Sequence, residues 1–210
     1  TKPELCIERA RIYTESDRNS GIMPKALKHS KAVAEVLRNM TVFIGDDELI
    51  VGNQARKLRS APVFPEYDVD WLSEELDQLS ERKADPFLVA EDEKEEFRRI
   101  IDYWKGKTHR DRVDFYSSED IVEGRANGVL VGAHLLSGSH VHVAVGYEKI
   151  LKVGLKGYIA EIDDELSKID LKKAEDLNKI DFFKGAKEML EAAIDFAERF
   201  ADEAERKASE

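Results

Sequence analysis

Cysteine is nearly absent from this chain, whose 210 residues include one, Cys6. A single thiol excludes an internal disulfide and fits a reducing compartment, so we expect a cytoplasmic protein. Cys6 stands between Leu5 and Ile7 in a segment that the sequence predicts to be helical. Its apolar neighbours indicate a small core residue and not a nucleophile.

Long apolar runs and excess positive charge are also missing. No stretch of eighteen apolar residues could span a membrane, and the first residues have no apolar signal-peptide core. The net charge of −11 argues against binding to nucleic acid or to an anionic membrane, because both would repel the chain. Gly-rich phosphate loops and the patterns HExxH, GxSxG and CxxC do not occur. Motif spacing alone therefore identifies no enzyme.

The sequence does contain strong helical periodicity, with 42% hydrophobic and 37% charged residues. The fold class that we expect is predominantly α with a few short strands. A two-stranded hairpin is predicted at 42–44 and 49–51, and a short strand within 124–132. Loops or irregular segments are expected at 17–21 and 54–67, broken helix or loop at 106–118, and a frayed tail at 201–210. Helices are predicted over 3–16, 24–40, 69–82, 91–105, 147–169 and 180–204.

Two of these helices carry specific expectations. Gly154 and Gly157 lower helix propensity, which suggests that another backbone approaches the helix closely there. In the last helix, Phe182, Met189 and Phe196 widen the apolar stripe beyond what one partner covers. That helix should therefore pack against neighbours on two sides.

A histidine cluster lies in the stretch 132–158, where His134, His140 and His142 fall within nine positions. On a strand, His140 and His142 would point to the same side. Three interpretations are open: a metal site, a hydrogen-bonded structural histidine, or a histidine that contacts a ligand. No carboxylate or cysteine at fixed spacing completes a metal site, so no metal is expected.

Two charged clusters have simple interpretations. Arg56, Lys57 and Arg59 could bind an anion, but in an acidic protein they more often neutralise neighbouring carboxylates. The acidic run Asp46-Asp47-Glu48 is typical of a turn and its solvated flank.

Five blocks in order resemble the N-terminal part of a glycyl radical enzyme of the pyruvate formate-lyase-like family. The similarity is greatest to the branch with the B12-independent glycerol and propanediol dehydratases. Lys28-His29, Leu58 and Gly146 depart from the pattern of that branch. The blocks are CIERARIYTES (6–16), DDELIVGN (46–53), RSAPVFPEY (59–67), WKGKT (104–108) and HVAVGYEKILKVGLKG (142–157).

The resemblance implies a ten-stranded α/β barrel, of which residues 1–210 form a single N-terminal region. It implies a glycyl radical near a distant C-terminus, a catalytic cysteine on a loop outside this chain, and activation by a radical S-adenosylmethionine enzyme. Homodimers that work without oxygen are the rule in such a family. The 210 residues alone are therefore expected to be inactive, with no catalytic residue and no bound cofactor of their own.

The resemblance also implies one site residue, since the histidine of the HVAVGY block in the dehydratase branch binds substrate hydroxyls. That role carries over to His142. The implied function is a radical lyase or dehydratase acting on a small polar organic substrate such as a diol. A non-catalytic helical interaction or scaffold module is the alternative if 210 residues is the natural length.

Overall fold

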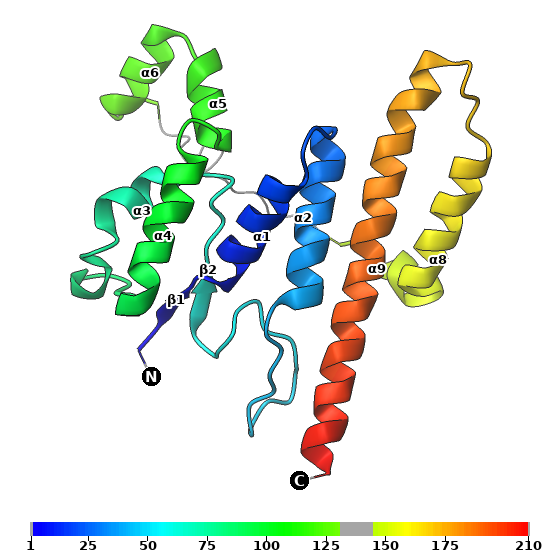
Figure 1. Cartoon of the computed structure of the whole chain (residues 1–210), viewed down its shortest axis with the longest axis horizontal. Coiled ribbons are helices and arrows are strands. Elements are labelled where there is room, and N and C mark those ends of the chain that lie inside the picture. Colours follow the sequence, from blue (N-terminus) through cyan, green and yellow to red (C-terminus); the bar gives the residue numbers. More distant parts are fainter. Residues whose placement is uncertain (1, 131–144, 210) are drawn as a thin grey trace. The chain divides into compact units, whose positions relative to one another are not determined.

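The structure is a computed structural model that describes residues 2–130 and 145–209 (Figure 1). It divides into two compact units, the first formed by residues 2–10 and 59–130 and the second by residues 11–58 and 145–209. The described elements are β1 (Glu4–Cys6), α1 (Glu8–Asn19), α2 (Lys25–Asn39), β2 (Ser60–Pro62), α3 (Asp70–Glu75), η1 (Leu79–Glu81), α4 (Glu91–Trp104), α5 (His109–Tyr116), α6 (Glu119–Ala126), α8 (Tyr147–Ser167) and α9 (Ala174–Ala208).

The first unit begins with a strand where the sequence predicted a helix. β1 pairs in parallel with β2, with Leu5 opposite Ala61 and Cys6 opposite Pro62. The amide of Leu5 also donates to the carbonyl of Leu88 at 2.9 Å. The predicted helix over 3–16 was wrong at its start because these partners lie far along the sequence. The interpretation of Cys6 is confirmed, since the thiol is free and 1% exposed.

α4 supplies the core of the first unit. Phe97, Ile100, Ile101 and Trp104 are all buried, at the three- and four-residue spacing that predicts one helical stripe. Leu72 of α3 and Leu79 of η1 are also buried. The predicted helix over 69–82 is broken between them. The carbonyl of Leu79 accepts from the amide of Phe87 at 3.1 Å, so it is not available to a continuing helix.

Two short helices follow α4 in the first unit: α5 lies where the sequence predicted broken helix or loop, and α6 extends into the stretch where a strand was predicted. α5 begins at a complete capping box, in which Thr108 and Asp111 each accept from the other's backbone amide. That pattern was present in the sequence and was overlooked. α6 occupies 119–126, and the described residues 127–130 that follow form no strand.

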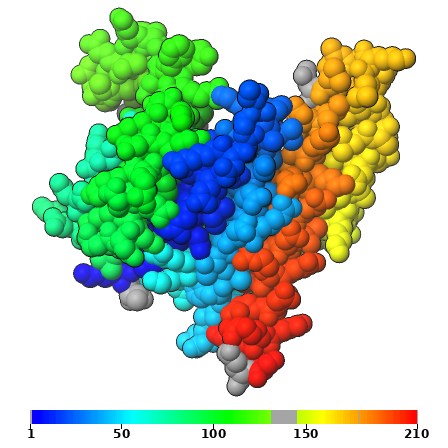
Figure 2. Space-filling view, in the orientation of Figure 1, coloured from blue at the N-terminus to red at the C-terminus, as the bar shows by residue number. Residues whose placement is uncertain are grey.

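In the second unit α9 lies between α2 and α8, as Figure 2 shows in orange, light blue and yellow. The expectation that the last helix packs on two sides is thus confirmed. α9 is longer than predicted at both ends, and most of the predicted frayed tail is helical. Gly185 of α9 faces Ser30 of α2 so closely that an added Cβ would lie 2.5 Å from the serine hydroxyl.

The glycines of α8 have a different role from the one predicted. Gly154 has φ 63° and ψ −178° and kinks the helix, a backbone conformation that other residues rarely adopt. A Cβ added at Gly154 would meet nothing within 4 Å, and the atoms nearest to Gly157 belong to Val153 of the same helix. The close approach of a second backbone predicted for α8 is therefore wrong, and Gly185 of α9 is where helices meet closely.

Residues 41–58 form no hairpin, so that prediction was wrong. Leu49 and Ile50 are 98% and 91% exposed, and no further strand covers them. The acidic turn is confirmed, because the amide of Glu48 donates to the carbonyl of Gly45 at 3.2 Å. The described chain is thus mostly helical with two short strands, and none of its described helices could cross a membrane.

Candidate functional site

The three histidines that the sequence singled out lie outside the residues that the structure describes. His134, His140 and His142 fall in the stretch 131–144. The role expected of His142 therefore stays a prediction. Among the described residues, no group of three His, Cys, Asp or Glu side chains is placed to hold a metal.

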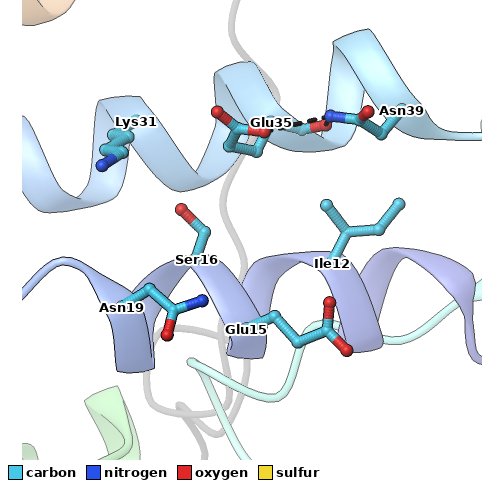
Figure 3. A pocket seen from close by; sticks show the side chains of 7 residues that line it. All are labelled: Ile12, Glu15, Ser16, Asn19, Lys31, Glu35 and Asn39. Atoms are coloured by element: carbon cyan, nitrogen blue, oxygen red, sulfur yellow. Dashed lines mark hydrogen bonds between the residues drawn. The ribbon is translucent and has the colours of Figure 1, made fainter.

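A polar groove opens in the second unit between α1 and α2, with a volume of about 440 Å³ (Figure 3). We call it the α1–α2 groove. Ile12 and Ser16 point from α1 towards α2, and Lys31 points back from α2. Six of its seven lining side chains are polar. They are Ile12, Glu15, Ser16 and Asn19 on α1 and Lys31, Glu35 and Asn39 on α2.

Helical periodicity builds both walls of this groove. On α1 the lining residues follow the spacing i, i+3, i+4, i+7, and on α2 they follow i, i+4, i+8. The side chain of Asn39 donates to the backbone carbonyl of Glu35 at 2.8 Å and to its carboxylate at 3.0 Å. This groove was not predicted from the sequence. The sequence feature that could have revealed the groove is on α1, where polar residues occupy the i, i+3, i+4, i+7 positions that usually carry apolar core residues.

The first unit contains a nearly buried ion pair between Arg9 and Glu66. Two hydrogen bonds of 2.6 and 3.0 Å join the guanidinium to the carboxylate, and the side chains are only 11% and 8% exposed. Arg9 also donates to the carbonyl of Val63 at 3.2 Å and lies 3.7 Å from the centre of the Phe64 ring. The RSAPVFPEY block is thus fixed to α1 by one arginine. Burial, followed by the charge of Glu66, raises the pKa of Tyr67.

A second ionic cluster joins the starts of α3 and α5. The carboxylate of Asp68 accepts from the amide of Asp70 at 2.9 Å and from Arg110 at 3.0 Å. The hydrogen bond to Asp68 raises the pKa of Arg110 above its usual value. The side chain of Asp68 is 4% exposed, so this arginine compensates a carboxylate that is removed from water.

Arg56, Lys57 and Arg59 of the basic cluster each interact with other groups of the protein. Both interpretations of this cluster, as an anion site or as a partner of neighbouring carboxylates, stay predictions. Arg59 has φ 61°, and its carbonyl accepts from the amide of Glu4 at 3.1 Å.

Known proteins resemble this chain in both sequence and fold. The structure of the glycerol-bound B12-independent glycerol dehydratase from Clostridium butyricum matches 99% of the chain, with a TM-score of 0.95 and 34% identity. The probable dehydratase YbiW of Escherichia coli (strain K12) is 35% identical over 200 residues, 95% of the chain. The (2S)-3-sulfopropanediol dehydratase of Klebsiella oxytoca is 29% identical over 211 residues, 98% of the chain.

Two of these neighbours are named as dehydratases and the third as a probable dehydratase. The profile of the pyruvate formate lyase-like proteins matches residues 1–210, and the chain belongs to that family. The resemblance found in the five sequence blocks is therefore confirmed. The chain covers only 25% of the length of each of the two sequence relatives and 26% of the glycerol dehydratase.

Proposed function

We propose that this chain is the N-terminal portion of a glycyl radical lyase or dehydratase that acts on a small polar organic substrate such as a diol. The observation that carries the proposal is the match of the family profile to all 210 residues. The 34% identity to a glycerol dehydratase supports the dehydratase branch. Residues 1–210 would form one region of a larger catalytic domain and contribute to its ten-stranded barrel.

The reactive groups of this enzyme would lie outside the chain. A glycyl radical installed by a radical S-adenosylmethionine enzyme would pass to a cysteine, which removes hydrogen from the substrate. Cys6 does not fit the role of that cysteine, because it is 1% exposed in β1. We therefore expect the 210 residues to be inactive alone. The full-length protein is proposed to be a cytoplasmic homodimer that works without oxygen.

His142 is the residue that we assign to the substrate. A neutral imidazole can donate one hydrogen bond and accept another, so it can orient two neighbouring hydroxyl groups. That orientation suits a reaction in which hydrogen is removed from one carbon and hydroxide leaves the next. The assignment rests on the family resemblance of the HVAVGY block, which ends at the start of α8.

The proposal is tested in the full-length protein after anaerobic activation. Electron paramagnetic resonance should detect a glycyl radical, and its absence would refute the function. The intact mass of the native protein is a second check, because a natural species of 23.9 kDa would favour the scaffold alternative.

Substituting His142→Ala should weaken binding of glycerol about tenfold or more, the effect of one or two lost hydrogen bonds, and leave the radical yield unchanged. His134→Ala and His140→Ala are matched controls in the same stretch and should leave the affinity unchanged. An unaltered affinity in the His142 variant would remove this residue from the site.

A further inference from the structure

The floor of the α1–α2 groove contains a hydroxyl group without a partner. Ser16 is 8% exposed, and its Oγ forms no hydrogen bond to any of the described residues. Figure 3 shows this hydroxyl pointing from α1 into the space below α2. A buried hydroxyl without a partner is unfavourable by about 1–3 kcal/mol, and native proteins rarely leave one. A polar occupant of the groove would supply the missing hydrogen bond.

The charged side chains of the groove are also available to an occupant. Lys31 and Glu35 are four residues apart on α2 but do not pair with each other, whereas Lys28 and Arg38 of the same helix form ion pairs with Asp17 and Glu188. Within the described parts of the chain, the side chains of Glu15 and Lys31 have no hydrogen-bonding or ionic partner. Only Glu35 is engaged, by Asn39. The groove thus offers one ammonium group and two carboxylates.

A neighbouring cavity does not change the excess of one negative charge in the groove. It has a volume of about 260 Å³, lies between α2 and α9, and shares Lys31 and Glu35 with the groove. It adds Lys184 and Glu188, one charge of each sign. The two cavities together therefore still carry one more negative than positive charge.

We propose that the α1–α2 groove binds a small molecule that carries both an ammonium group and a carboxylate, such as an amino acid. The ammonium would pair with Glu15 or Glu35, the carboxylate with Lys31, and a polar atom with the hydroxyl of Ser16. The volume of about 440 Å³ falls within the usual range for small-molecule sites. This site is additional to the proposed substrate contact of His142 and does not depend on the proposed function.

Other occupants fit the lining less well. An apolar helix would cover the polar side chains of Glu15, Ser16 and Lys31 without offering them a hydrogen bond, which is unfavourable. A simple anion would meet two carboxylates, and a simple cation would leave Lys31 without a partner. Only a molecule with both charges satisfies both kinds of lining group.

Equilibrium dialysis of the natural full-length protein, without activation, tests the proposal with radiolabelled 4-aminobutyrate. Butylamine and butyrate are the matched competitors, since each lacks one of its two charges. We expect 4-aminobutyrate to bind and each competitor to displace it at least about tenfold less effectively than unlabelled 4-aminobutyrate does. No binding, or equal displacement by all three compounds, would overturn the proposal.

Variants locate the bound molecule. Lys31→Met should weaken 4-aminobutyrate binding about tenfold, whereas Lys25→Met, on the same helix but outside the groove, should not change it. Lys31→Glu should reverse the preference, so that butylamine binds more tightly than 4-aminobutyrate. Ser16→Ala should weaken binding by a smaller factor.

A His142→Ala variant distinguishes this site from the proposed substrate site. It should retain full binding of 4-aminobutyrate in the groove. Loss of binding in this variant, together with normal binding in Lys31→Met, would place the compound elsewhere and refute the groove site. Circular dichroism of each variant verifies that the helices are intact.

Discussion

In the first unit, α4 places large side chains in a core, with Phe97 fully buried beside buried leucines of α3 and η1. In the second unit, α9 approaches α2 closely where Gly185 lies against Ser30, and Ala32, Ala34 and Ala192 of these two helices are fully buried. Both units bury large side chains, but the close approach of two helices at a glycine is described in the second unit. The same kind of substitution should therefore act differently in each.

The ion pairs of the two units differ in how deeply they are buried. Arg9 and Glu66 of the first unit are about nine-tenths buried, whereas Arg38 of the second unit is 30% exposed between Glu188 and Asp195. Hydrogen bonds to Asp195 and then Glu188 raise the pKa of Arg38. A half-exposed pair contributes little to stability, while breaking a buried pair leaves an uncompensated charge. Sensitivity to charge removal should thus be concentrated in the first unit.

The largest effect is expected from Phe97→Ala. Removing a fully buried aromatic side chain should lower the free energy of unfolding by about 3–5 kcal/mol, because it leaves a cavity. Chemical denaturation of the 210-residue chain measures this loss. Phe115→Ala on α5 is the matched control, since that ring is 80% exposed, and it should change stability by less than about 0.5 kcal/mol. Equal losses in the two variants would contradict the burial described for α4.

Glu66→Gln should have the next largest effect. It removes the carboxylate charge that the nearly buried guanidinium of Arg9 binds at 2.6 Å, which should cost about 3 kcal/mol of stability. Glu75→Gln is the control, because Glu75 is 41% exposed in its pair with Arg82 and should contribute less than about 1 kcal/mol. If the control were as damaging as Glu66→Gln, the contrast between buried and exposed pairs would fail.

Gly185→Ala tests the close approach of helices in the second unit. The added methyl group would lie 2.5 Å from the hydroxyl of Ser30 and 3.1 Å from its Cβ, so α2 and α9 must shift. We expect a loss of about 1–2 kcal/mol, although alanine has the higher helix propensity. In a Ser30→Ala background the loss should be smaller, because the hydroxyl clash is gone. A stabilising effect of Gly185→Ala would show that the helices are not in close contact.

The smallest effect is expected at Asp46. The hydrogen bond from Lys207, together with its charge, lowers the pKa of Asp46 from its usual value of 3.8. A lowered pKa in the folded state means that the pair stabilises the fold above pH 3.8 and that this contribution is lost as pH falls through the lowered value. Asp46→Asn should remove this dependence.

Hydrogen exchange of the last turn of α9 measures the effect of Asp46→Asn. At pH 7 the variant should exchange slightly faster near Lys207, while the neighbouring Asp47→Asn should behave like the parent chain. Identical exchange in the parent chain and in Asp46→Asn would show that the pair does not hold the end of α9.

The sequence predicted the long helices because each carries a continuous apolar stripe, as in α4 with Phe97, Ile101 and Trp104. It failed where partners lie far apart in the chain. β1 needs β2 some 56 residues away, between Glu4 and Ser60, and no local pattern reveals that pairing. The apparent hairpin around Asp46 had β-branched residues and turn geometry, but no third strand to cover it.

The two candidate sites also differ in how much of each could be predicted from the sequence. The α1–α2 groove could have been found from polar residues at core spacing on α1, but the partnerless hydroxyl of Ser16 is visible only in the structure. His142, by contrast, came from the resemblance of a sequence block. Composition and spacing left its role open, because a histidine on a strand suits structural and binding roles equally.

We propose that this chain is part of a glycyl radical enzyme and that formation of the radical does not depend on His142. Electron paramagnetic resonance of the full-length protein after anaerobic activation, recorded for the parent and for His142→Ala side by side, tests it most directly. We predict the same glycyl radical signal in both proteins and its loss on exposure to air. Absence of the signal from the activated parent protein would contradict the claim.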